Sequence, residues 1–188
     1  LIKNLSIEEL QDFFYEYSQP KYRAEQVLKE IYLNRVSDFS DMTTIPKNLR
    51  EILNTNFHIN SITEYQTQKS ADGTIKFLFQ LNDGQKIESV LIPDDRKKSS
   101  DKLRMTLCVS SQVGCTLNCT FCATGKLGFK RNLDTAEIID QVLFAEKIAS
   151  VKLSNIVFMG MGEPTYNLAN VTKAIKIISS PINQLLSP

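Results

Sequence analysis

The sequence predicts an α/β fold in which a small helical module and a short β-meander precede the first strand and helix units of a larger domain. Apolar residues recur at helical spacing up to residue 55 and alternate with polar residues between 61 and 93. From residue 105 onwards, strand-like runs alternate with helix-like segments. With 42% hydrophobic and 23% charged residues, the composition is that of an ordinary globular chain. We therefore divide the chain into residues 1–60, 61–98 and 99–188.

Residues 1–60 are predicted to form a helical module. Ser6 and Glu9 match a capping box ahead of the first helix, and Pro20 and Pro46 are each suited to the first turn of a further helix. The apolar stripes that follow these starts are Leu10, Phe13, Phe14 and Tyr17; Val27, Leu28, Ile31 and Tyr32; and Leu49, Ile52 and Leu53. We interpret these stripes as the core faces of three helices.

Residues 61–98 are predicted to contain a hairpin or meander. The alternating run from Ile75 to Leu81 is followed by the turn sequence Asn82-Asp83-Gly84, after which the alternation resumes. Glu88 falls on the strand face that also carries Val90 and Ile92. A carboxylate held near apolar surroundings has a raised pKa that suits proton transfer, whereas an exposed strand glutamate has no such role. The residue pattern leaves both interpretations open.

Residues 99–188 alternate strands and helices. Apolar strands are predicted at 105–109 and 155–160, and Asp134 with Glu137 marks the start of the helix between them. A further helix follows the turn Gly162-Glu163-Pro164. Strands that are apolar throughout, in this order, predict a parallel sheet with crossover helices.

All four cysteines lie between Cys108 and Cys122. No apolar run approaches the roughly 20 residues that span a bilayer, and the start has no signal-peptide pattern. We therefore expect a cytoplasmic, reducing location, where clustered cysteines favour metal binding or reactive thiols over disulfides.

Cys115, Cys119 and Cys122 follow the spacing C-x-x-x-C-x-x-C. Three thiolates can hold three irons of a [4Fe-4S] cluster and leave the fourth iron open to a small molecule. A structural zinc site needs four ligands, and Cys108 is available as a fourth. The single run of three cysteines favours the open iron-sulfur site, and zinc stays as the alternative.

The predicted strand ends place two loops together. In parallel α/β sheets, ligands bind beyond the carboxyl ends of the strands. The cysteine loop follows the first apolar strand and the Gly162-Glu163 turn follows the second. Glu163 is suited to accept hydrogen bonds from an ammonium group bound at the open iron.

The net charge is only +1, but the part of the chain with the cysteines is the more basic. Basic residues cluster on both sides of the cysteine loop, at Arg96, Lys97, Lys98, Lys102 and Arg104, and at Lys126, Lys130 and Arg131. Such clusters attract a phosphate-bearing partner, although charge alone is more typical of a solvated surface.

Several motifs together carry a resemblance to a known family. They are Cys108-Val-Ser-Ser-Gln-Val-Gly-Cys115, Cys119-Thr-Phe-Cys122-Ala-Thr-Gly125, Gly128-Phe-Lys-Arg-Asn-Leu133, Gly160-Met-Gly-Glu-Pro164, Ile87-Glu88-Ser-Val90, Ile92-Pro93 and Pro20-Lys-Tyr-Arg-Ala24. In these motifs the chain resembles the radical S-adenosylmethionine (SAM) enzymes, and among them the RlmN/Cfr group of RNA adenosine methyltransferases. The resemblance implies that residues 99–188 form the first two units of a radical SAM partial (β/α)6 TIM-like barrel.

The resemblance also implies a role for each candidate residue. Cys115, Cys119 and Cys122 would ligate the [4Fe-4S] cluster, and Gly162 and Glu163 would contact SAM. Glu88 would be the proton acceptor. Cys108 would resolve the protein–RNA adduct through a transient disulfide with a methyl-carrying cysteine that lies beyond residue 188.

The implied activity is methylation of carbon 2 of an adenine in 23S rRNA and in tRNA. The helical module and the basic clusters would serve RNA recognition, the electron donor would be a flavodoxin- or ferredoxin-like protein, and the enzyme would be a monomer. The alternatives are methylation at carbon 8, or a non-catalytic fragment that binds RNA or metal. Because the methyl-carrying cysteine is not in the sequence, we expect the 188-residue chain alone to be inactive.

Overall fold

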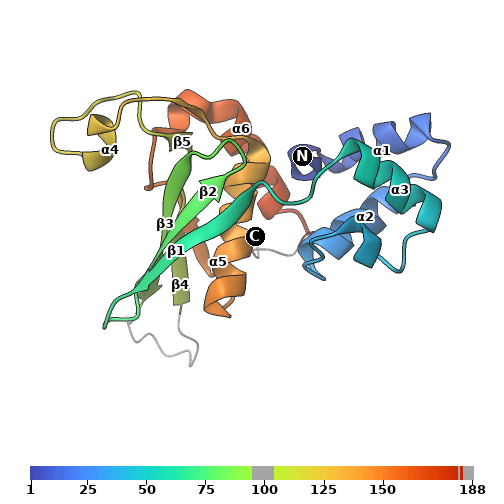
Figure 1. Ribbon diagram of the computed structural model, residues 1–188, viewed down its shortest axis with the longest axis horizontal. Helices are drawn as coiled ribbons and strands as arrows, with labels where there is room; N and C mark the ends of the chain where they lie inside the picture. Colours follow the sequence, from blue (N-terminus) through green and yellow to red (C-terminus); the bar gives the residue numbers. More distant parts are fainter. Residues whose placement is uncertain (95–103, 182, 184–188) are drawn as a thin grey trace.

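A computed structural model gives the architecture of the protein and describes residues 1–94, 104–181 and 183. Figure 1 shows the helices α1–α3 at one end of the molecule and the β-sheet at the other, with α5 between them and the α4 loop projecting beyond the sheet. The α/β class predicted from the sequence is confirmed, with N-terminal helices and a meander ahead of the strand and helix units.

The helical module comprises α1 (Ile7–Glu16), α2 (Tyr22–Tyr32) and α3 (Lys47–Asn56), with short 3-10 turns at η1 (Ile2–Asn4) and η2 (Phe39–Asp41). The predicted capping box is present, since Ser6 Oγ accepts from the Glu9 N–H at 3.2 Å and Glu9 Oε2 accepts from the Ser6 N–H at 2.6 Å. Helix α2 begins two residues after Pro20, so the proline precedes the helix rather than occupying its first turn.

Five strands form one sheet in the order β1-β2-β3-β4-β7. They are β1 (Ile62–Lys69), β2 (Ile75–Leu81), β3 (Lys86–Asp94), β4 (Arg104–Cys108) and β7 (Asn155–Val157). Neighbours are antiparallel as far as β4, and β4 pairs with β7 in parallel. The meander therefore continues directly into the parallel pair through β3 and β4, while the division of the chain at residues 60 and 98 stays a prediction.

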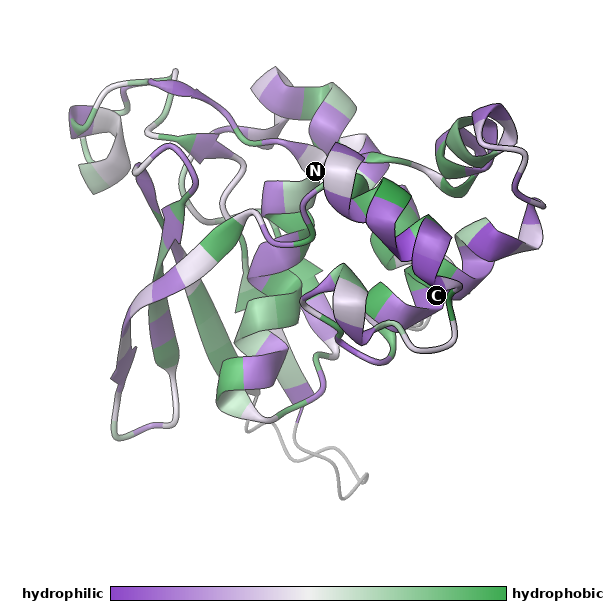
Figure 2. Cartoon of the chain, turned by 45° about the vertical axis from the view of Figure 1, so that its right-hand side comes forward, coloured by the Kyte–Doolittle hydropathy of each residue, from purple (hydrophilic) through white to green (hydrophobic). Residues whose placement is uncertain are grey.

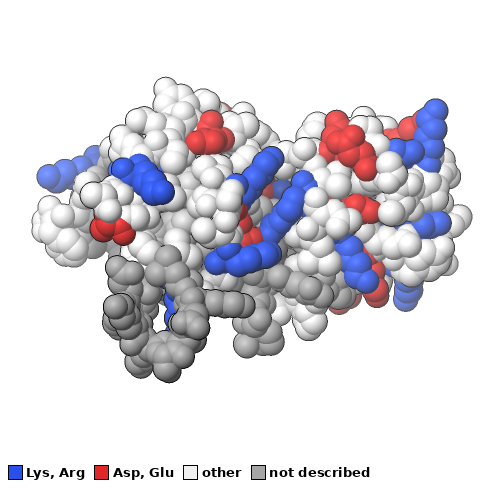
Figure 3. Space-filling model, turned by 90° about the horizontal axis from the view of Figure 1, so that it is seen from below, with Lys and Arg blue, Asp and Glu red and all other residues white. Residues whose placement is uncertain are grey.

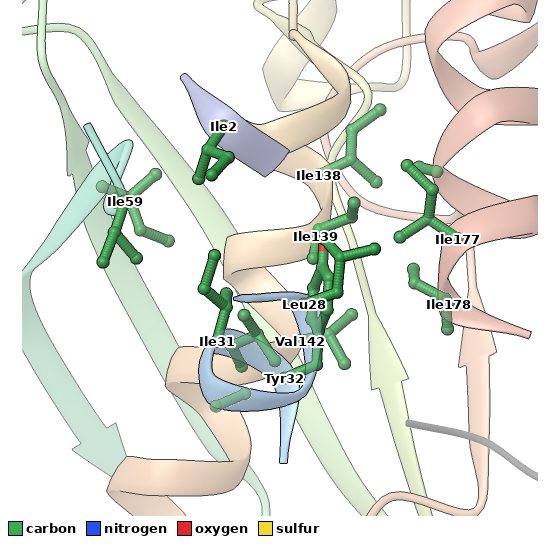
Figure 4. Close-up of a cluster of buried hydrophobic side chains, with 14 of the residues drawn as sticks. Ile2, Leu28, Ile31, Tyr32, Ile59, Ile138, Ile139, Val142, Ile177 and Ile178 are labelled. Atoms are coloured by element: carbon green, nitrogen blue, oxygen red, sulfur yellow. The ribbon is translucent and has the colours of Figure 1, made fainter. Parts of the chain in front are cut away.

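The crossover helix α5 (Thr135–Ala149) joins the two parallel strands, as the sequence predicted, and α6 (Leu168–Ile178) follows β7. Phe144 of α5 packs edge-on against Phe79 of β2, with ring centroids 6.2 Å apart. Figure 2 shows hydrophobic residues along α5 and along the strands behind it. Figure 4 shows Ile139 and Val142 of α5 beside side chains of α2 and α6, within one core shared by the module and the sheet.

The second parallel strand is shorter than predicted. The sequence placed a buried strand at 155–160, but β7 ends at Val157 and Met159 is 80% exposed. Within the described residues, β7 pairs only with β4, so it has no second neighbour to prolong it. The apolar run beyond Val157 therefore belongs to a loop at the strand end.

Polar side chains join the helical module to α5. Asp140 of α5 is fully buried and accepts from Lys3, from the Ser61 N–H at 2.8 Å and from Ser61 Oγ at 2.5 Å. Arg35 forms an ion pair with Glu146, whose carboxylate also accepts from the Leu153 N–H at 3.0 Å. Figure 3 shows basic and acidic side chains gathered where the module meets the rest of the molecule. These bonds fix the module to the helix that crosses the sheet.

Across the described ranges, none of the helices has the combined length and apolar character that crossing a membrane requires.

Candidate functional site

The two predicted loops meet at the carboxyl edge of the parallel strands. The chain leaves β4 at Cys108 and enters β5 (Gln112–Val113), while β7 leads into the turn around Met161. The N–H groups of Ser111 and Gln112 both donate to the Met161 carbonyl, at 2.8 and 3.2 Å. The structure therefore brings the start of the cysteine loop against the Gly162-Glu163 turn.

The cysteine loop is closed at its base by a two-stranded ribbon. There β5 pairs with β6 (Arg131–Asn132), and the loop carries the short helix α4 (Ala123–Lys126) at its far end (Figure 1). Gly114 has a φ of +75° and lies so close to the Gly128 carbonyl that a Cβ would overlap it. This close approach of the two backbones requires glycine.

The three cysteines of the predicted cluster motif lie on this loop, and all are free and partly exposed. Backbone hydrogen bonds from Gly125 and Thr124 lower the pKa of the Cys122 thiol. In the part of the chain that the structure describes, no three Cys, His, Asp or Glu side chains converge on a point that could hold a metal ion. The chemistry of the donor set fits an iron-sulfur cluster, because cluster irons are held by thiolates. The ligand assignment itself stays a prediction.

Cys108 and Glu88 lie on the same face of the sheet, the face opposite α5. Cys108 pairs with Val90 across the β3–β4 ladder, and Glu88 is two residues from Val90 along β3. Burial raises the pKa of the Cys108 thiol. The Glu88 side chain is 43% exposed and forms an ion pair with Lys76 at 2.6 Å, so it has a cationic partner in place of the apolar surroundings considered from the sequence.

Glu163 sits in the turn after β7 and caps the 3-10 turn η3 (Pro164–Asn167). Its carboxylate accepts from the Thr165 N–H at 3.1 Å and from Thr165 Oγ1 at 2.8 Å. The backbone hydrogen bond, followed by the hydroxyl bond, lowers the pKa of Glu163. The side chain is therefore anionic at neutral pH and suited to bind a cation.

Buried amide and hydroxyl groups brace this edge of the sheet, and the sequence interpretation had not singled them out. Gln141 of α5 accepts from the Ser110 N–H at 2.7 Å and from Ser89 Oγ at 2.8 Å. Ser110 Oγ donates to the Glu88 carbonyl at 2.6 Å and accepts from the Met161 N–H at 2.9 Å. The sequence signal was the run of three polar residues, 110–112, directly after an apolar strand.

The basic residues around the loop differ in their surroundings. Arg131 is not a free cation, because it bonds Asp83 at 2.7 Å and makes two hydrogen bonds of 2.8 Å to Glu137. These carboxylates raise the pKa of Arg131 above its usual range. Lys126 and Lys130 are exposed. The predicted basic residues Arg96, Lys97, Lys98 and Lys102 lie outside the described residues, whereas Arg104 begins β4.

A pocket of about 360 Å³ opens between the β2–β3 turn and the cysteine loop. Lys86 and Lys130 line it, together with Gly84, Gly114 and Met161. It gives the loop edge both a concave surface and positive charge.

A cysteine loop after the first parallel strand, facing a Gly-Glu turn after the second, places the chain in the radical SAM class of proteins. Residues 109–185 match the family described as "Radical SAM superfamily". The fold is also that of a solved radical SAM methyltransferase from Sphaerobacter thermophilus, with a TM-score of 0.85 and 37% sequence identity over 96% of this chain and 52% of that one.

Residues 2–59 match the family described as "Ribosomal RNA large subunit methyltransferase N-terminal domain". The dual-specificity RNA methyltransferase RlmN of Campylobacter lari is 45% identical, over 90% of this chain and 50% of the relative. The probable RlmN of Cytophaga hutchinsonii is 47% identical, over 95% and 48%. The chain belongs to the RlmN family, and it spans about half the length of these curated relatives.

Proposed function

We propose that this chain belongs to a radical SAM methyltransferase that methylates carbon 2 of an adenine in 23S rRNA and in tRNA. The observation that carries the proposal is the pairing of two loops at one sheet edge, where Ser111 and Gln112 bond Met161. One loop holds the three-cysteine motif and the other holds Glu163. The RlmN relatives, at about 45% identity, support the choice of RNA as substrate.

In this proposal, Cys115, Cys119 and Cys122 hold a [4Fe-4S] cluster at the end of the exposed loop. When bound, the cluster and SAM supply the one-electron chemistry that an inert aromatic carbon requires. The ribbon at the base of the loop holds the start of the loop, through Ser111 and Gln112, against the turn at Met161. The Glu163 carboxylate, anionic at neutral pH, is then available to the ammonium group of SAM.

Glu88 and Cys108 are proposed to act on the RNA. They share the sheet face opposite α5, close to the edge where the two loops meet. Glu88 would take the proton that leaves carbon 2, and its carboxylate is 43% exposed on this face. Cys108, which pairs with Val90 on the same face, would be the resolving residue.

The remaining partners follow from this chemistry. The helical module and the lysines beside the loop would contact the RNA backbone, whose phosphates attract cations. The reduction step needs an electron donor, for which a flavodoxin- or ferredoxin-like protein is suited. We place the protein in the cytoplasm, as a monomer.

Anaerobic reconstitution of the chain with iron and sulfide tests the proposal. We expect about four irons per chain, a brown protein that loses its colour in air, and binding of SAM only after reconstitution. Replacing Cys115, Cys119 or Cys122 with alanine is expected to abolish iron uptake, whereas Cys108→Ala is expected to leave it unchanged. Cys108→Ala is the matched control because it removes a cysteine outside the motif.

A colourless protein that retains stoichiometric zinc through the same treatment, and loses it in Cys108→Ala, would instead identify a structural four-cysteine site.

A further inference from the structure

Gln112 is a fully buried glutamine between the two candidate loops. Its Oε1 accepts from the backbone N–H of Glu163 at 3.0 Å, and its Nε2 donates to Asn132 Oδ1 at 2.8 Å. Its own backbone N–H donates to the Met161 carbonyl at 3.2 Å. One side chain therefore links β5, β6 and the turn that follows β7.

The orientation of this amide is set by its neighbour. Asn132 Nδ2 donates to the Tyr166 carbonyl at 3.1 Å, so Asn132 presents its oxygen to Gln112. Gln112 must therefore donate to Asn132 through its NH₂ group, which leaves the Gln112 amide oxygen to accept from the Glu163 N–H. In this series of three hydrogen bonds, Glu163 donates to Gln112, Gln112 to Asn132 and Asn132 to the Tyr166 carbonyl. The series begins at Glu163, the residue proposed to bind the SAM ammonium group.

The turn also packs directly on Gln112. Gly162 has a φ of +96°, and a Cβ built there would lie 2.5 Å from the Gln112 Cβ. The absent side chain at 162 thus makes room for the buried one at 112. Contact and hydrogen bond together leave the turn little freedom relative to β5.

We propose that Gln112 is a positioning residue for SAM: it holds the Glu163 backbone so that the carboxylate meets the ammonium group beside the cysteine loop. This inference rests on the proposed function. A buried N–H that loses its acceptor pays a desolvation penalty, so the turn is expected to shift when Gln112 is replaced by an apolar residue.

The first test measures SAM binding to the chain reconstituted with iron and sulfide, by equilibrium dialysis with radiolabelled SAM. Gln112→Leu removes both side-chain bonds at similar volume and is expected to raise the SAM dissociation constant about tenfold, with iron per chain unchanged. Ser61→Ala, which removes a buried hydrogen bond to Asp140 outside the two loops, is the control and is expected to bind SAM normally.

The second test needs neither cluster nor SAM. Amide hydrogen exchange of residues 160–165 is expected to be about tenfold faster in Gln112→Leu, and unchanged in Ser61→Ala. If Gln112→Leu does not fold, Asn132→Ala, which releases the Gln112 amide, is expected to show both effects at about a third of their size.

Equal SAM affinity in Gln112→Leu and the unsubstituted chain, or unchanged exchange in the turn, would overturn the inference. If the unsubstituted chain takes up no cluster and no SAM, the proposed function fails. In that case, the exchange measurement still decides whether Gln112 holds the turn.

Discussion

The junction between the helical module and α5 differs sharply from the cysteine loop. At the junction, Lys3 and Asp140 are buried and bonded to each other, and desolvation by burial lowers the pKa of Lys3 although Asp140 opposes this. In the loop, Phe121 is 91% exposed and the three motif cysteines are free and partly exposed. The junction is thus held by contacts within the chain, while the loop keeps its most reactive side chains available for a ligand. Changes at the two places are expected to have opposite consequences.

The largest effect on stability is expected from Asp140→Ala. The change leaves the Lys3 ammonium buried without its carboxylate, which costs about 3–5 kcal/mol of unfolding free energy. Urea denaturation measures the loss. Lys3→Met combined with Asp140→Leu is expected to recover most of it, because the cation is then also absent. A loss under about 1 kcal/mol for Asp140→Ala would mean that water reaches the site, and the contrast between junction and loop would break down.

Gly162→Ala is expected to cost about 2–4 kcal/mol, from a left-handed conformation and an overlap with Gln112. Gly84 is the matched control, since it has a φ of +82° and a Cβ added there would meet no atom within 4 Å. Gly84→Ala is expected to cost only about 1–2 kcal/mol, the conformational part. Equal losses in thermal denaturation would show that the contact with Gln112 contributes nothing.

Cys108 ends β4, directly before the cysteine loop, and has a thiol whose pKa is raised by burial. Since the thiolate is the reactive form, alkylation of Cys108 is expected to rise at higher pH than for an unperturbed thiol, whose pKa is about 8.5. The same shift makes the unfolding free energy depend on pH. The stabilisation from the buried neutral thiol is fully present below the unfolded-state pKa and is lost as the pH rises through the folded-state pKa. Mass spectrometry of iodoacetamide labelling in the cluster-free chain measures the rate, with the urea-unfolded chain as control. An identical pH profile in both states would contradict this.

The smallest effect on stability is expected from Cys119→Ala. The side chain is partly exposed and forms no disulfide, so the unfolding free energy of the cluster-free chain is expected to change by less than about 0.5 kcal/mol. Iron uptake is nevertheless expected to be lost, as measured by iron analysis after reconstitution. A large loss of stability without iron would show that the loop is held by its own side chains and is not built for a ligand.

Sequence patterns were sufficient for the features that depend on local chemistry. The capping box at Ser6 and Glu9, the alternation along β2 and the crossover helix after Asp134 were all predicted, because each rests on side chains close together in the chain. The order of apolar strands also predicted that the cysteine loop and the Gly162-Glu163 turn share an edge. These are consequences of period and composition.

Only the tertiary structure decided which distant polar groups meet. The bonds of Gln112 to Glu163, of Lys3 to Asp140 and of Gln141 to Ser89 join residues 51 to 137 positions apart. No local pattern distinguishes such a buried amide or ion from a solvated one, because the difference lies in the desolvation that packing imposes. The sequence by itself determined the class of fold and the candidate ligands of a cluster, while packing decided what holds the two loops in place.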